Sequence, residues 1–133
     1  KTLTRCKHIQ LEDRLHFDET LSPVCLPNGD QSIPDDALAV AVGFGSNNEI
    51  MADNIATTHV CAGSFGHGTA PGDSGGPLLM PSDDGKWFQI GVTSYGNHSL
   101  LRQQDISPGV YTNVKEFCDW IKDTTNGEAT CED

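Results

Sequence analysis

An all-β fold with one helix at its C-terminal end is predicted by three features of this 133-residue chain. First, 14 glycines and 7 prolines break the sequence into short runs separated by turn signals. Second, larger and smaller apolar residues alternate within Ala37–Phe44, as they do in a strand of a barrel or sandwich wall. Third, helical spacing of apolar residues occurs only near the C-terminus, so the chain is expected to be mostly β.

Six runs have the length and composition of strands: Ser22–Leu26, Ala37–Phe44, His59–Ser64, Gly76–Met80, Trp87–Ser94 and Gly109–Asn113. In the second run the residues Leu38, Val40 and Val42 share one face, and small alanines take the other. The polar segment between Met80 and Trp87 predicts a hairpin turn, in which Gly85 supplies a positive φ.

The predicted helix runs from about Val114 to about Thr124, because apolar residues recur at i, i+3, i+4 and i+7 from Val114 onward. Asn113 and Glu116 have the spacing of a capping box, with Asn113 as the N-cap. The acidic tail that follows is expected to fray unless Cys131 ties it back to Cys118 or to another thiol.

Composition excludes several function classes. The formal net charge is -11, so the clustered Lys and Arg that nucleic acid binding needs are lacking, and no nucleic acid partner is expected. No apolar run approaches the roughly 20 residues of a membrane span, and no apolar leader follows Lys1. The five cysteines contain no C-x-x-C pair, which disfavours a zinc site and favours disulfides. Because five is odd, at least one cysteine is expected to lack a partner within these residues.

The hexamer Gly72–Pro77 is the most informative motif for chemistry. Three glycines around a serine free the backbone for close approach to a ligand, and such a turn can aim two N–H groups at one point. Acyl transfer needs a hydroxyl nucleophile beside N–H donors that hold the negative oxygen of the tetrahedral intermediate. Ser74 and the amides of Gly72 and Ser74 are candidates for these roles, and an ordinary glycine-rich turn is the alternative.

The chain resembles the C-terminal half of a chymotrypsin-like (trypsin-like, peptidase family S1) serine protease. The matching segments occur in the family's order: Ser22–Pro27, Val42–Gly45, Val60–Gly63, Gly72–Leu78, Ile90–Gly96, Pro108–Thr112 and Phe117–Ile121. The resemblance implies an antiparallel Greek-key β-barrel followed by an α-helix, the second barrel of a two-barrel fold that is incomplete in this chain. Residues 9–125 are therefore expected to form the C-terminal part of the protease domain, after a divergent or truncated segment 1–8 and before an acidic tail 126–133.

The resemblance also implies roles for individual residues. Ser74 is the nucleophile, the N–H groups of Gly72 and Ser74 form the oxyanion hole, and Asp73 is the residue that pairs with a new N-terminal ammonium when a zymogen is activated. The substrate pocket is expected to involve Gly68, Thr69, Ser94, Tyr95, Gly96 and Gly109. Gly68 stands at the pocket floor, where trypsin-like members place an Asp, so a neutral floor argues against a basic substrate residue and favours an apolar or aromatic one.

Three departures from the family pattern stand out. No histidine base or buried Asp is recognisable, and Arg5 occupies the position of that Asp; His67 and His98 are the least implausible substitutes for the base. A family disulfide is absent, with Ala70 and approximately Ser99 at its two positions. The interval 45–60 is short by most of a hairpin. The family's pattern places the partners of Cys25 and Cys61 outside these residues, upstream and in that shortened interval.

The leading interpretation is a serine-type endopeptidase, here a partial domain without His and Asp triad members that is inactive alone. The alternative is a non-catalytic protease homologue that acts as a binding or interaction module. The intact Gly72–Pro77 motif favours the first, and Arg5 favours the second. The expected partners are a peptide or protein substrate and a missing N-terminal barrel, whose contact face should be exposed here. Asn97 begins a glycosylation sequon, which together with the cysteines suggests a secreted or extracellular protein. No metal or cofactor motif is present.

Overall fold

The computed structural model describes residues 9–28, 33–43 and 49–131. Its strands are β1 (Ala37–Ala41), β2 (Glu49–Ala56), β3 (His59–Gly63), β4 (Pro77–Pro81), β5 (Trp87–Tyr95) and β6 (Gly109–Asn113). A 3-10 helix η1 (His98–Leu100) lies between β5 and β6, and the 3-10 helix η2 (Val114–Phe117) leads directly into the α-helix α1 (Cys118–Thr124).

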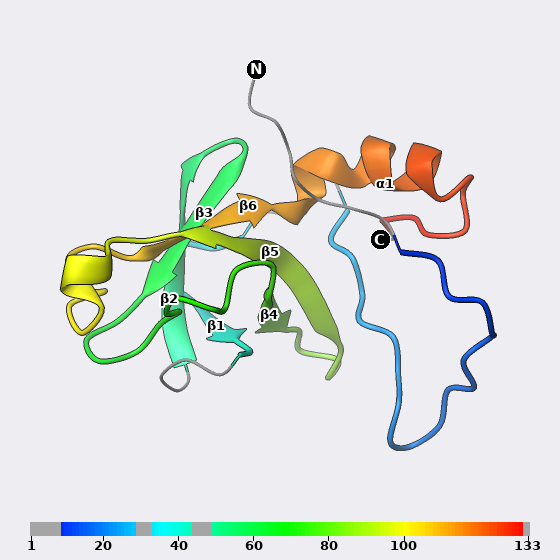
Figure 1. Ribbon diagram of the computed structural model, residues 1–133, viewed down its shortest axis with the longest axis horizontal. Coiled ribbons are helices and arrows are strands. Elements are labelled where there is room, and N and C mark those ends of the chain that lie inside the picture. Colours follow the sequence, from blue (N-terminus) through cyan, green and yellow to red (C-terminus); the bar gives the residue numbers. More distant parts are fainter. Residues whose placement is uncertain (1–8, 29–32, 44–48, 132–133) are drawn as a thin grey trace.

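The strands pair antiparallel in the order β1-β2-β3-β6-β5-β4, and the sheet closes on itself into a barrel. Closure depends on a short seam in which Val40 pairs with Leu79 and Ala41 pairs with Leu78. The predicted fold class, an antiparallel β-barrel with a C-terminal helix, is confirmed. Figure 1 shows α1 beyond the end of β6, to one side of the barrel.

The barrel interior is filled by a small number of side chains from several strands. The core residues are Ile33, Ala39, Val60, Ala62, Leu78, Met80, Ile90 and Tyr111. In β1 the predicted alternation is present, and the alanine face points inward: Ala39 is fully buried, whereas Leu38 is 46% exposed. A narrow barrel has room for small residues opposite large ones, and the buried Tyr111 and Leu78 supply the bulk.

Five of the six expected strands are present within a few residues of their predicted bounds, and one is wrong. Residues 22–26 form no strand; Cys25 instead makes an isolated parallel bridge to Phe88, with hydrogen bonds to Trp87 and Gln89. Conversely, β2 was not expected, because its composition includes residue types that are depleted in strands. Pairing with β1 on one side and β3 on the other stabilises β2 despite that composition.

The hairpin between β4 and β5 is confirmed. Gly85 has φ +84°, and the amide of Ser82 donates to the carbonyl of Lys86 over 2.9 Å.

The helical segment covers the predicted range, but its first turn is 3-10 rather than α. The expected capping box does not form: Asn113 is the N-cap residue, yet its side chain makes no capping bond. Asn113 is buried beside the β2–β3 turn, and its Nδ2 donates instead to the carbonyl of Thr57 in that turn over 3.0 Å.

Among the described cysteines, Cys118 and Cys131 form a disulfide that ties the tail to α1, which is one of the two predicted alternatives. Cys25 is half-buried and Cys61 is buried, and neither forms a disulfide with another described residue. Residues 9–24 form a long loop away from the strands (Figure 1), and it carries exposed apolar side chains, including Ile9 and Phe17. Within the described ranges, no helix has the length and apolar character needed to span a membrane.

Candidate active site

Ser74 lies on a tight turn just before β4, and its side chain is exposed. The turn depends on Gly72 (φ +107°) and Gly75 (φ +86°), whose backbone conformations side-chain-bearing residues rarely adopt. Its ends are fixed by hydrogen bonds. The amide of Gly75 donates to Thr93 of β5 over 2.9 Å, and Gly76 donates to the carbonyl of Asp73 over 2.9 Å. The serine is thus held in one place against the barrel wall.

Asp73 points the other way, into the protein, and is only 7% exposed. Its Oδ2 accepts a hydrogen bond from the amide of Ala70 over 2.8 Å, and its own amide donates to the carbonyl of Ala70 over 3.1 Å. The carboxylate packs on Gly43, where an added Cβ would lie 2.5 Å from Oδ1. A glycine at position 43 is therefore required by the buried carboxylate that anchors the Ser74 turn.

Three of the residues predicted to form the pocket lie close together. Gly96 follows β5 and Gly109 begins β6, and a Cβ on Gly96 would lie 3.7 Å from the Cα of Gly109. Thr69 lies across from them, since its Oγ1 would be 3.0 Å from a Cβ on Gly109. Ser94 and Tyr95 are exposed at the end of β5, one and two residues after the strand position that bonds the Ser74 turn.

Tyr111 supports this group from the barrel core. Its hydroxyl donates to Thr69 Oγ1 over 3.4 Å, and burial raises the pKa of Tyr111 above its ordinary value, with Asp73 and Cys61 adding to the rise and the Thr69 bond opposing it. The tyrosine therefore stays neutral at physiological pH and acts here as a donor.

Gln104 is a site residue that the sequence did not reveal. It belongs to the loop between η1 and β6 and is only 4% exposed, and its Nε2 donates to the carbonyls of Thr69 (2.9 Å) and Leu101 (3.3 Å). Its carboxamide lies against Gly68, so that a Cβ on that glycine would overlap it. Nothing in a polar loop sequence distinguishes one buried glutamine from its exposed neighbours.

The described histidines, which do not include His8, make other contacts than a bond to Ser74. In the described part of the chain, no histidine nitrogen makes a hydrogen bond to the hydroxyl of Ser74. His59 bonds to Thr58 instead, and the Nδ1 of His67 is buried with no hydrogen-bond partner among described residues. His98 lies in η1, on the loop after Gly96. The same part of the chain holds no group of three or more His, Cys, Asp or Glu residues that could bind a metal ion.

The family model for trypsin matches residues 4–121 of the chain. The chain belongs to the trypsin family. Two curated proteins are similar to it in sequence. The bovine (Bos taurus) "Suppressor of tumorigenicity 14 protein homolog" is 32% identical over 86% of the chain. The human "Atrial natriuretic peptide-converting enzyme" is 31% identical over 86% of the chain. The matched regions are 16% and 13% of those two proteins, so the chain spans only a small part of each relative.

Trypsin-family membership places this chain in the serine protease family. The structure places the predicted nucleophile on a hydrogen-bonded turn beside β5 and groups Thr69, Gly96 and Gly109 at the adjoining ends of β5 and β6. It brings no described histidine into hydrogen-bond contact with the serine. Arg5, the residue expected at the position of the family's Asp, lies outside the described residues.

Proposed function

We propose that Ser74 is the nucleophile of a serine-type endopeptidase and that the N–H groups of Gly72 and Ser74 form its oxyanion hole. The observation that carries the proposal is the exposed Ser74 on a turn hydrogen-bonded at both ends, in a chain of the trypsin family. In the reaction, the serine oxygen bonds to the scissile carbonyl carbon while its proton passes to a base. The amine then leaves with that proton, and water releases the acyl group.

Residues 1–133 are proposed not to turn over peptides by themselves. The reaction needs a base that takes the proton of Ser74, and no described histidine bonds to that hydroxyl. Enzymes of this kind that lose triad members retain only weak catalysis. The His and Asp would come from a second barrel. Exposed apolar side chains on residues 9–24, namely Ile9, Leu11, Leu15, Phe17, Leu21 and Val24, support such a contact face.

The substrate is proposed to be a peptide or protein with an uncharged residue at P1, the residue whose carbonyl is attacked. Gly68 carries no charge at the expected pocket floor, and Gly96 and Gly109 present no side chains along the adjoining strand ends. Asn97, exposed beside Gly96, is proposed to be glycosylated, and the disulfide between Cys118 and Cys131 agrees with a secreted or extracellular protein.

A non-catalytic homologue that binds peptides or proteins is the second candidate. It is favoured by Arg5, which stands where the family has the Asp that orients its histidine. A charged guanidinium at that position cannot accept the hydrogen bond that fixes a histidine tautomer.

A serine-directed phosphonate probe tests the proposal. The probe is applied to the longest natural gene product that contains these residues. Rapid labelling at Ser74 that is lost in Ser74→Ala supports the endopeptidase. An exposed serine away from this turn, changed in Ser22→Ala, serves as the matched control. Absence of labelling in that product would favour the binding module. Labelling of residues 1–133 alone at an enzyme-like rate would refute the claim that they need a base from elsewhere.

A further inference from the structure

The carboxamide of Gln104 occupies the position where a pocket-floor side chain would begin. A Cβ on Gly68 would lie 2.6 Å from Nε2 of Gln104 and closer still to its Cδ and Oε1. Gly68 also has φ +148°, a conformation that favours glycine. Position 68 therefore lacks a side chain for two reasons, and the volume above it belongs to a residue 36 positions later in the chain.

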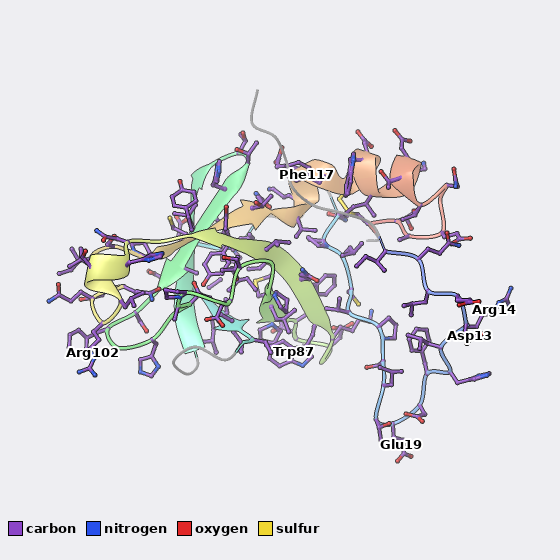
Figure 2. The ribbon with its side chains drawn as sticks, viewed as in Figure 1. Asp13, Arg14, Glu19, Trp87, Arg102 and Phe117 are labelled. Atoms are coloured by element: carbon purple, nitrogen blue, oxygen red, sulfur yellow. A yellow bond between two sulfur atoms is a disulfide. The ribbon has the colours of Figure 1, made fainter. Side chains whose placement is uncertain are left out.

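The loop around Gln104 is fastened to the segment that carries Gly68. The amide of Gly66 donates to the carbonyl of Arg102 over 3.0 Å, and a Cβ on Gly63 would lie 2.7 Å from the Cβ of Gln104. Figure 2 shows Arg102 at the periphery of this loop, away from the barrel. Gln104 is the inward-facing residue, 4% exposed, and its two hydrogen bonds hold the carboxamide in place.

We propose that Gln104 is a specificity-determining residue: it forms the floor of the pocket beside Ser74 and limits that pocket to small, uncharged P1 side chains. The inference rests on the proposed function and names the substrate class of the same site. Thr69 narrows the space from the side, because its Oγ1 lies against Gly109. The Oε1 of Gln104 is buried with no hydrogen-bond donor among the described residues, and the carboxamide carries no charge. A buried Lys or Arg side chain would lose its hydration there without an opposite charge.

Binding of small probes to the chain tests the proposal without requiring catalysis. Indole represents a large P1 side chain and benzamidine a cationic one, and each is titrated into isotope-labelled protein while the amide signals of Gly68 and Gly109 are followed by NMR. Gln104→Ala should bind indole about tenfold more tightly than the unchanged chain, as burial of roughly two more methylene-sized groups would give. Gln103→Ala, which removes an exposed neighbour, should leave indole binding unchanged. Benzamidine binding should remain weak in every variant.

Two further variants keep the test decisive if Gln104→Ala loses its fold. Gln104→Asn keeps the carboxamide and shortens the side chain by one methylene, so it should deepen the pocket by a smaller step. A double-mutant cycle joins Gly68→Ala to Gln104→Ala or Gln104→Asn. Gly68→Ala strains the backbone whether residue 104 is changed or not, so this strain is the same on both sides of the cycle. The melting temperatures are therefore non-additive only if the change at Gln104 relieves the overlap between its carboxamide and the added Cβ.

Equal indole binding by the unchanged chain, Gln104→Ala and Gln104→Asn would overturn the proposal, as would additive melting temperatures in the cycle. So would unfolding of both Gln104 variants, which would make the residue structural only. None of these readings involves the serine hydroxyl, and none of them requires catalysis. Failure of the pocket assignment is thus separate from failure of phosphonate labelling.

Discussion

Replacing Asp73 tests whether the Ser74 turn depends on its buried carboxylate. The variant Asp73→Ala removes the acceptor of the 2.8 Å bond from the amide of Ala70 and leaves that amide without its partner. Losing a bond to a charged group in a part-buried site costs about 2 kcal/mol. In a domain of this size, where each kcal/mol shifts the melting temperature by roughly 3–4 °C, the expected fall is about 6–8 °C. Asp73→Asn keeps an acceptor oxygen and should lose about half as much.

Thermal unfolding followed by circular dichroism measures the fall, and hydrogen exchange at the Ala70 amide locates it. That amide should exchange faster in Asp73→Ala, because the bond that protects it is gone. Asp83→Ala, an exposed aspartate of the β4–β5 turn, is the matched control and should stay within about 0.5 kcal/mol of the unchanged chain. If Asp73→Ala matches this control in both readings, the carboxylate does not anchor the turn.

Three further predictions concern stability and pH. Cys131→Ser opens a disulfide that spans 13 residues and should lower the free energy of unfolding by roughly 2–3 kcal/mol, measured by denaturant titration. Because burial raises the pKa of Tyr111, stability should fall as pH rises above about 10, and Tyr111→Phe should abolish this fall in melting curves. Asp84 is exposed, and hydrogen bonds from Ser82 and Lys86 lower its pKa to about 2. The stabilisation of the turn should therefore be present above about pH 4 and lost as pH falls through 2, and a carboxyl NMR titration that returns an ordinary pKa would contradict this.

The strands that sequence patterns predicted are those with a strong local signal. Gly109–Asn113 has β-branched and aromatic residues bounded by turns, and the structure has a strand with those same bounds. The strand β2 was missed because its stability comes from pairing on both edges rather than from its composition. The opposite error, a strand expected over Ser22–Leu26, arose from apolar residues in a segment that makes only one bridge to the barrel.

The residues of the candidate site also divide into those with a local sequence signal and those without one. The Gly72–Pro77 motif was visible because its glycines permit backbone angles that other residues resist, and two of them do have positive φ. Gln104 was not visible, because its burial depends on how a long loop folds back onto Gly68. The capping role predicted for Asn113 was wrong for a similar reason, since its side chain donates to the carbonyl of Thr57, which is distant in the sequence.

The residues of the Gly72–Pro77 motif differ in how far they distinguish an enzyme from a binding module. A homologue without catalysis would still need Asp73, which fills space against Gly43, and Gly76, whose added Cβ would lie 2.9 Å from the carbonyl oxygen of Asp73. It would equally need Gly75 for its φ of +86°. Ser74 is different, because it is exposed and its hydroxyl makes no hydrogen bond to described residues. The serine is thus the residue of this turn whose presence packing leaves unexplained, and this favours the nucleophile over the structural turn.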